Sequence, residues 1–518
     1  MKQKISSDSY LEVNISQKPA IELLKTMGYT YISPEDCEVQ RGNRNNVLLK
    51  DILRGQLRKI NRYTYGGAVN EFSAANIERA IEDLDEPLTD GLVRTSEKIY
   101  DSLLLGKSYL ETVGEGKMLS FNLKYIDWDN WNNNTFHITE EFAVDSKDKQ
   151  HNARVDVVLF INGIPFSTIE CKAPHISVDQ AVEQTIRNQQ KEYIPQLFKY
   201  IQIAIATNKN SVKYATTNTP KKFWNIWKEE KDNFISTEFA KYSTDKIMTE
   251  QDKNLISLLN IDRVKEFIRY FILFDANVKK ICRHQQYFAI KEIINTIKEI
   301  DEHGNRQSGL VWHTQGSGKS LTMVMLAKYI LMELSAYNPR VVIVTDRKEL
   351  DGQITATFAH TRLNPARATS GRHLVDLVNG NTADIITSII NKFNTAESKG
   401  TKNLSKDVFV LVDESHRSNY GLMATKMRTV FPNACYIGFT GTPLMKKEKS
   451  TMAKFGKLIH KYTIKDGVED GAIVPLIYEG RFVEQNVDEA NIDLWFAQTT
   501  KRLTELQKED LSKKWSSI

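Results

Sequence analysis

The stretch from Leu310 to Ser320, LVWHTQGSGKS, constrains the fold of this chain more than any other. A short apolar run leads into a turn that carries Gly316 and Gly318, and the apolar segment LTMVMLAKYIL that follows predicts a helix. A strand that passes through a tight turn into a helix is the repeating unit of a parallel sheet covered by helices. Glycines in the turn let backbone N–H groups approach an anion, and the start of the helix directs its free N–H groups to the same place. The stretch therefore predicts an α/β fold with a phosphate-binding loop.

Side chains of this loop match the groups that a nucleoside triphosphate requires. Lys319 is placed to reach the β and γ phosphates, and the Ser320 hydroxyl to reach a bound Mg²⁺. Thr314 and Ser317, with the two glycines, complete the expected ATP-binding set. The usual pattern has one more glycine, where this chain has His313, so the loop has the shorter form Thr-x-Gly-x-Gly-Lys-Ser. That form resembles the first motif of superfamily 2 helicases and translocases.

Four later apolar runs predict further strands of the same parallel sheet: RVVIVTD, ADIITSI, VFVLVDE and ACYIGFTGT. Asp413 and Glu414 end the third run, where Asp413 can hold Mg²⁺ and Glu414 can orient an attacking water. Thr440, Gly441 and Thr442 end the fourth run and suit a loop that responds to the nucleotide. Read alone, an Asp-Glu pair is usually a solvated turn, and the GFTGTP segment has a plain strand–turn as its alternative. The phosphate-binding loop earlier in the chain is what favours a functional interpretation of both segments.

The amino-terminal half has a different character, because residues 118–170 alternate β-rich runs with turn signals such as DNWNNN and NG. Asp156 lies in one predicted strand, and Glu170 and Lys172 lie on one face at the end of the next. Two carboxylates and a lysine that converge on a hairpin can bind Mg²⁺ and hydrolyse a phosphodiester. The carboxylates bind the metal ion, and the lysine positions or deprotonates the nucleophile. Charged strand ends are common, but an unpaired charge at the end of an apolar run is costly, which favours a site.

This spacing resembles the PD-(D/E)xK nuclease pattern. In a subset of these nucleases a Gln-x-x-x-Tyr element lines the DNA-facing side of the core, and Gln196 and Tyr200 fit it. Gln189 and Tyr193 have the same spacing. The later pair is preferred because Leu197 supplies an apolar second position.

The segments GLVWHTQGSGKSLTM, VTDRKELDGQ, DESHRSNYG and GFTGTPL together resemble the motor motifs of the R subunit of type I restriction–modification enzymes. RHQQYFAI is similar to the adenine-reading segment of that family, with Gln286 in the glutamine position. The resemblance implies an ATP- and Mg²⁺-dependent endonuclease subunit that translocates duplex DNA and cuts it away from the recognition site. It also implies methyltransferase and specificity subunits as partners. A cytoplasmic location is expected from the composition and from the lack of a signal-peptide or membrane-spanning pattern.

The resemblance suggests a domain plan of an α/β multidomain chain. Residues 1–245 are expected to form the nuclease domain with helical elements at its amino terminus, 246–280 a helical junction, 281–475 the first RecA-like motor lobe, and 476–518 an incomplete start of the second lobe. Helical patterns are predicted over 17–30, 90–113, 176–200 and 240–280. Since a superfamily 2 motor needs two lobes, we expect this sequence to bind nucleotide weakly, to hydrolyse it poorly and not to translocate.

Composition excludes several other classes. The chain has 518 residues, a net charge of only +5, and four scattered cysteines without a CxxC pair, so neither a zinc site nor a disulfide framework is indicated. The amino terminus lacks the apolar core of a signal peptide, and no run is long enough to span a membrane. KKFWNIWKEEKDNF interleaves aromatics with lysines, but the spacing of Phe223, Trp224 and Trp227 favours a packing face over a nucleic-acid surface. Two alternatives remain: a stand-alone helicase–nuclease of DNA repair, and a truncated, non-catalytic module that binds DNA or a partner.

Overall fold

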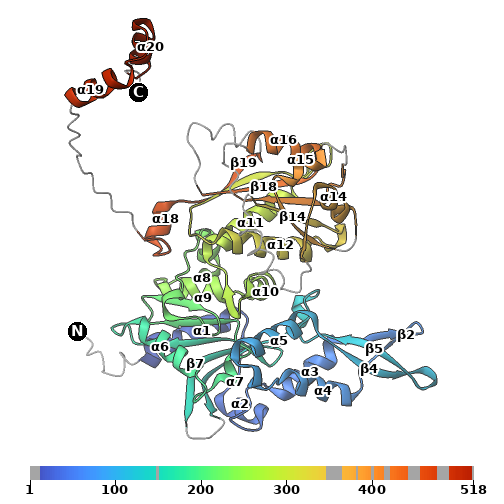
Figure 1. The fold of residues 1–518 in the computed structure, drawn as a ribbon. Helices are drawn as coiled ribbons and strands as arrows, with labels where there is room; N and C mark the ends of the chain where they lie inside the picture. Colours follow the sequence, from blue (N-terminus) through green and yellow to red (C-terminus); the bar gives the residue numbers. More distant parts are fainter. Residues whose placement is uncertain are drawn as a thin grey trace. The chain divides into compact units, whose positions relative to one another are not determined.

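The computed structural model describes residues 12–146, 151–345, 365–380, 383–397, 402–413, 420–441, 455–474 and 489–515 (Figure 1). The chain divides into two compact units, Met1–Ile473 and Val474–Ile518. The first unit holds two large sheets. In the second unit the described residues form two helices, α19 (Glu489–Thr499) and α20 (Glu505–Trp515).

The first sheet has six strands in the order β1-β6-β7-β8-β9-β10. Their bounds are β1 (Thr30–Tyr31), β6 (Phe136–Asp145), β7 (Asn152–Ile161), β8 (Ile164–Cys171), β9 (Ile203–Thr207) and β10 (Val212–Ala215). β6, β7 and β8 pair antiparallel, whereas β8 and β9 pair parallel. The β7–β8 turn is Asn162-Gly163, both with positive φ, as a tight two-residue hairpin requires. Every residue of β8 is buried, so the charged end of this strand lies in a desolvated setting.

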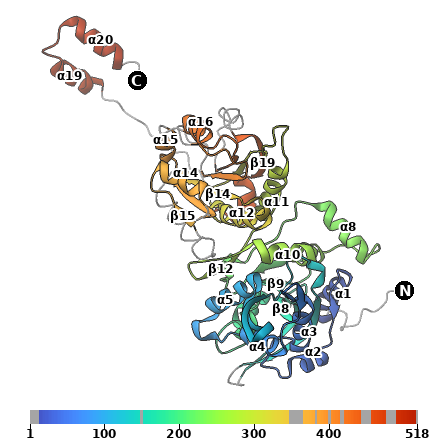
Figure 2. The same ribbon diagram turned by 90° about the vertical axis from the view of Figure 1, so that its right-hand side faces the viewer.

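Helices cover this sheet: α1 (Lys18–Thr26), α2 (Pro34–Arg41), α3 (Lys50–Ile60), α4 (Ala74–Leu84), α5 (Leu92–Leu105), α6 (Val178–Asn188) and α7 (Pro195–Phe198). Figure 2 shows α1, α3, α4 and α5 around strands β8 and β9. Two antiparallel hairpins accompany them, β2 (Tyr63–Tyr65) with β3 (Ala68–Asn70), and β4 (Lys107–Val113) with β5 (Lys117–Leu123).

Two helix predictions in this half were too long. The helix expected over 90–113 stops at Leu105, because Gly106 has a φ of 74° and the next seven residues alternate between buried and exposed as strand β4. The helix expected over 176–200 is broken between α6 and α7, since Pro195 starts a new helical turn. The spacing of apolar residues along the sequence did not distinguish these interrupted helices from continuous ones.

The second sheet has seven parallel strands in the order β15-β16-β14-β17-β18-β13-β19. The five predicted runs are strands β13 (Gly309–His313), β14 (Arg340–Thr345), β16 (Ile385–Ile389), β17 (Val408–Val412) and β18 (Cys435–Thr440). The structure adds an edge strand on each side, β15 (Pro365–Arg367) and β19 (Lys457–Tyr462). The predicted parallel α/β sheet is therefore confirmed.

Both faces of this sheet are covered, which explains its continuous apolar strands. In β14, Val341 and Ile343 join the core that includes α12 (Lys319–Glu333), whereas Val342 and Val344 join the core that includes α14 (Gly371–Asn379) and α16 (Tyr420–Val430). Figure 1 shows these helices about β14 and β18, together with α15 (Lys392–Glu397). α11 (His284–Lys298) packs beside α12, and α18 (Ile464–Glu469) follows β19.

The segment between the sheets is helical only in part. It contains α8 (Asp232–Tyr242), α9 (Glu250–Leu259) and α10 (Ile261–Tyr270), and then the hairpin β11 (Ile272–Asp275) and β12 (Val278–Ile281). The helix prediction for 240–280 therefore fails after Tyr270. Ala276 and Asn277 both have positive φ and close a two-residue turn, a conformation that sequence patterning did not reveal.

Candidate functional site

The end of β8 meets the middle of β7 at a pair of buried carboxyls. Asp156 is 8% exposed and Glu170 1% exposed. Asp156 Oδ2 accepts a hydrogen bond from the backbone N–H of Cys171 at 2.6 Å, which ties the strand holding one carboxyl to the strand holding the other. The antiparallel pairing of β7 with β8 thus brings together two acids that are fourteen positions apart in sequence, by the difference of their numbers.

Burial perturbs both acids. It is the main cause that raises the pKa of Glu170 well above its usual range, and the negative charge of Asp156 raises it further. Burial also raises the pKa of Asp156, although the Cys171 N–H and the positive charge of Lys172 oppose that shift. Ionising both carboxyls costs free energy through desolvation and mutual repulsion. A bound cation offsets both costs, so the pair is suited to bind one.

Lys172 directly follows β8, and its side chain is 15% exposed. Its ammonium donates to the Cys171 carbonyl at 2.8 Å and lies 3.6 Å from a carboxylate oxygen of Glu12. Burial raises the pKa of Glu12, and the positive charge of Lys172 opposes that shift. Sequence reasoning missed Glu12, since nothing local links it to a strand more than a hundred residues away.

The donor set fits Mg²⁺. Among the described residues no group of three or more His, Cys, Asp and Glu side chains gathers as a metal cluster. Mg²⁺ does not need one, because it commonly takes one or two carboxylates and fills its other positions with water and substrate phosphate oxygens. Asp156 and Glu170 would supply those carboxylates, and oxygen ligands of this kind favour Mg²⁺ over zinc.

Two amide side chains of α6 hold Glu170 in place. Gln184 Nε2 donates to Glu170 Oε2 at 2.9 Å, and Asn188 Nδ2 donates to Glu170 Oε1 at 3.4 Å. They lie four residues apart on one face of the helix. The same spacing, in a helix that directly follows the strand, could have indicated them from sequence.

The glutamine–tyrosine pairs expected from sequence are engaged elsewhere. Gln196 Nε2 donates to the Asp145 carbonyl at 2.7 Å, and Tyr200 Oη hydrogen-bonds to Asp85 at 3.1 Å. In the alternative pair, Gln189 accepts from the Asn218 N–H at 2.6 Å, and Tyr193 packs against His151. None of these four side chains has a hydrogen bond to Glu170 among the described contacts; the glutamine that contacts Glu170 is Gln184.

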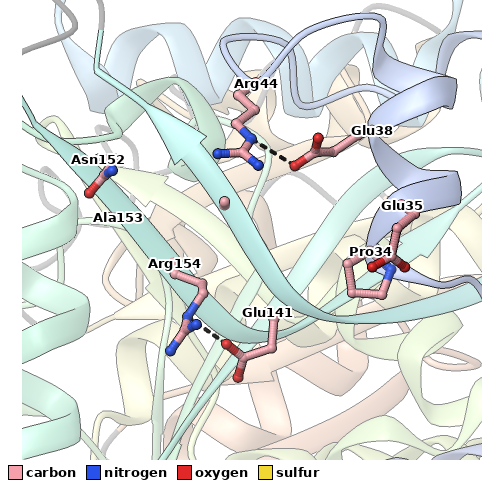
Figure 3. A pocket seen from close by; sticks show the side chains of 9 residues that line it. Pro34, Glu35, Glu38, Arg44, Glu141, Asn152, Ala153 and Arg154 are labelled. Carbon is pink, nitrogen blue, oxygen red and sulfur yellow. Dashed lines mark hydrogen bonds and ion pairs between the residues drawn. The ribbon is translucent and has the colours of Figure 1, made fainter.

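A groove of about 540 Å³ lies beside this site between α2 and strands β6 and β7 (Figure 3). Arg44 and Arg154 line it, and each is paired: Arg44 with Glu38 at 2.7 Å, and Arg154 with Glu141 at 2.5 Å. The groove therefore carries compensated charge rather than a continuous positive surface.

The phosphate-binding loop joins β13 to α12. Gly316 and Gly318 have φ of 84° and 90°, a left-handed region in which only glycine is unstrained. Gly318 is the N-cap of α12, so the helix begins at Lys319 with its free N–H groups facing the loop. Thr314 and Ser317 are buried within the turn, and Ser320 is half-buried in the first turn of the helix.

The carboxyl ends of three neighbouring strands converge on this loop. β17, β18 and β13 are adjacent in the sheet, so Asp413, Thr440 and the loop lie at one edge within about 10 Å. A Cβ built on Gly441 would lie 3.1 Å from Lys319 Nζ, which shows how closely the end of β18 approaches the lysine. Glu414 and Thr442, the other predicted residues here, lie outside the described residues.

Gln286 links α11 to the loop. Its Nε2 donates to the Gly318 carbonyl at 3.2 Å, and its Oε1 accepts from the Arg283 N–H at 2.9 Å. One end of the amide therefore braces the loop, the other end caps the start of α11, and Gln286 also lines a cavity next to the loop. An adenine-reading role would require this amide to exchange or share a partner.

A loop built on glycines, a lysine and a helix start suits a triphosphate. The Ser320 hydroxyl and the Asp413 carboxylate are the oxygen donors that would hold the accompanying Mg²⁺. No helix among the described residues is long and apolar enough to cross a membrane.

Two protein-family models match this arrangement of sheets. The model of the type I restriction enzyme R protein N terminus matches residues 9–223, and the SWI2/SNF2 ATPase model matches residues 285–509. The chain thus joins a restriction-enzyme amino-terminal domain to a helicase-like ATPase domain.

Two curated relatives align with most of the chain. The HindI type I restriction enzyme endonuclease subunit of Haemophilus influenzae is 30% identical over 90% of this chain and 46% of its own length. A Methanocaldococcus jannaschii protein, provisionally described as the MjaIXP endonuclease subunit, is 30% identical over 97% of this chain and 49% of its own length. The chain therefore shares the amino-terminal and ATPase regions of type I restriction enzyme endonuclease (R) subunits, and it spans about half the length of the curated relatives it matches.

Proposed function

We propose that the chain cleaves DNA phosphodiesters at Asp156, Glu170 and Lys172 and binds ATP at the loop of residues 314–320. The observation that carries the proposal is the buried Asp156–Glu170 pair, tied across β7 and β8 beside a lysine, on the same chain as a phosphate-binding loop. Two separate phosphate chemistries on one chain are what a DNA-cutting motor requires.

At the nuclease site, bound Mg²⁺ would supply charge neutralisation and an acidified water. Asp156 and Glu170 hold the cation, while Gln184 keeps the Glu170 carboxylate oriented through its 2.9 Å hydrogen bond. Lys172 stands at the open end of β8, where its ammonium can position the attacking water or neutralise the scissile phosphate. Gln196 and Tyr200 are better explained as structural residues by the partners described above.

At the nucleotide site, Lys319 and the loop N–H groups bind the β and γ phosphates. Ser320 and Asp413 hold Mg²⁺, Glu414 orients the water, and Thr440 to Thr442 respond to the γ-phosphate. The second lobe of such motors supplies an arginine to the transferring phosphoryl group.

In the assembly we propose, this chain is the translocating endonuclease subunit beside methyltransferase and specificity subunits, acting on duplex DNA in the cytoplasm. Residues 1–245 form the nuclease domain, 246–280 the junction, 281–475 the first motor lobe, and 476–518 the start of the second. Recognition and methylation would belong to the other subunits.

The test is plasmid nicking by the purified chain in Mg²⁺, with and without ATP, beside Lys172→Ala. Nicking that disappears in the variant supports the site. Nicking that survives Lys172→Ala overturns it. If the chain nicks only after the methyltransferase and specificity subunits are added, the nuclease depends on the assembly. If it still does not nick, the chain acts as a non-catalytic module that binds DNA or a partner.

A further inference from the structure

A cavity of about 400 Å³ opens beside the phosphate-binding loop, and its walls come from both halves of the first unit. Gly316, Ser317, Gly318 and Gln286 form one side. The segment from Ala215 to Asn225, which follows β10 of the first sheet, contributes to the other. A cavity of this size accommodates a flat ring system of ligand dimensions.

Phe223 is the aromatic side chain in this wall, and it departs from its neighbours. Trp224 and Trp227 are 7% and 4% exposed, as a packing face predicts, but Phe223 is 49% exposed. It ends a short 3-10 turn, Lys221–Phe223, and lines the cavity instead of the core. A half-exposed phenyl ring in an apolar recess offers a flat face that a ligand can cover.

The chemistry of the wall selects the base end of a nucleotide over its phosphate end. Lys280 lines the cavity, but its ammonium lies 2.6 Å from the Asp275 carboxylate. Lys279 is buried, and its ammonium donates to Ser96 and to the Ile201 carbonyl. Both lysines are thus committed, and Arg283 is the third cationic residue of the wall. Most of the other side chains that line the cavity are apolar, which suits the base of a nucleotide better than its phosphates.

The segment that carries Phe223 is held to the first sheet. The backbone of Asn225 pairs with Tyr214 of β10 through two hydrogen bonds of 2.8 and 2.9 Å. A ring held in this way costs little entropy to order when a planar ligand stacks on it.

We propose that this cavity is the base-binding part of the nucleotide site and that Phe223 stacks on the base of a bound purine nucleotide. The inference rests on the proposed ATP site and extends it, because the stacking residue belongs to the domain of the nuclease sheet and not to the motor sheet. Gln286, which lines the cavity beside Gly318, carries an amide that suits the polar edge of the base.

The experiment is calorimetric titration of the chain with ADP and, separately, with inorganic tripolyphosphate, which has no base. Phe223→Ala is expected to weaken ADP binding roughly tenfold, the scale of one base–aromatic stack, and to change tripolyphosphate binding by less than twofold. Phe223→Trp is expected to keep ADP affinity. Ile226→Ala is the matched control, since Ile226 is 55% exposed three residues further on and does not line this cavity.

Lys319→Ala separates a failure of the nucleotide site from a failure of base stacking by Phe223. If it abolishes binding of both ligands while Phe223→Ala binds ADP like the wild type, the stacking inference is overturned and the nucleotide site stands. If the wild type binds neither ligand, the nucleotide site fails, and the stacking inference fails with it. Equal weakening of ADP and tripolyphosphate by Phe223→Ala, with a lowered unfolding temperature, would overturn the inference in favour of a purely structural role.

Discussion

Replacing Glu170 by glutamine should stabilise the metal-free chain, although it should destroy the proposed nuclease. Glu170 is 1% exposed, and burial and the Asp156 charge raise its pKa well above the usual range. Glutamine has nearly the same shape and removes the charge. The Gln184 amide can turn over to match the new side chain, so the main loss is one poorly matched hydrogen bond in the Gln184–Asn188 pair.

The magnitude follows from two opposing terms. Relief of a buried, incompletely paired carboxylate contributes about 3 kcal/mol, and the mismatched amide costs about 1 kcal/mol. The net gain is about 2 kcal/mol, or roughly 4–8 °C in the unfolding midpoint for a domain of this size. Because the pKa is raised in the folded state, the folded chain holds this proton more tightly than the unfolded chain does. The stability that this tighter proton binding gives the wild type is complete below the ordinary glutamate pKa and is lost as the pH rises. The difference in unfolding free energy between Glu170→Gln and the wild type is therefore small near pH 5 and largest near pH 8.

The assay is thermal unfolding of both proteins in EDTA at pH 5.5 and pH 8, and then in Mg²⁺. At pH 8 in EDTA we expect Glu170→Gln to unfold at the higher temperature. Mg²⁺ should raise the midpoint of the wild type and leave that of the variant unchanged. A variant no more stable than the wild type at pH 8, or a difference independent of pH, would refute the account of a strained acidic pair.

Four other substitutions test three separate parts of the structure. Gln184→Ala should lower nicking by about tenfold, whereas Gln196→Ala should leave its rate unchanged and cost only about 1 kcal/mol in denaturant unfolding. Gly441→Ala, whose new methyl would lie 3.1 Å from the loop lysine, should weaken ATP binding about tenfold in a titration without lowering the unfolding midpoint. Burial lowers the pKa of Lys328 to about 7, so the stability it contributes above its ordinary pKa is lost as the pH falls toward 7. Lys328→Met should therefore stabilise the chain, by about 2 kcal/mol at pH 7.5 once the lost hydrogen bond to Tyr100 is subtracted. The gain should shrink toward pH 10, and denaturant titration at several pH values measures it.

Local sequence predicted much of the second sheet. The five apolar runs are strands, and Gly316 and Gly318 adopt the left-handed conformations that a tight loop requires. Both follow from interactions close in the chain: a strand buried on two faces must be apolar throughout, and only glycine takes such φ angles without strain. The same local reasoning ran one helix past Leu105 and another past Tyr270, where a following hairpin has no distinct apolar period.

The sequence alone indicated the chemistry proposed for the chain, through Asp156 within one strand, Glu170 and Lys172 at the end of the next, and Lys319 in a glycine loop. Tertiary structure decided which other residues contact the proposed nuclease residues. Gln184, and not Gln196, reaches Glu170 because the direction of α6 across β8 sets the meeting point. Phe223 turns from the core to the cavity by the loop in which it lies. Strand periodicity and glycine conformation act over a few residues and can be read from the chain, whereas contacts between distant segments exist only once the sheets have packed.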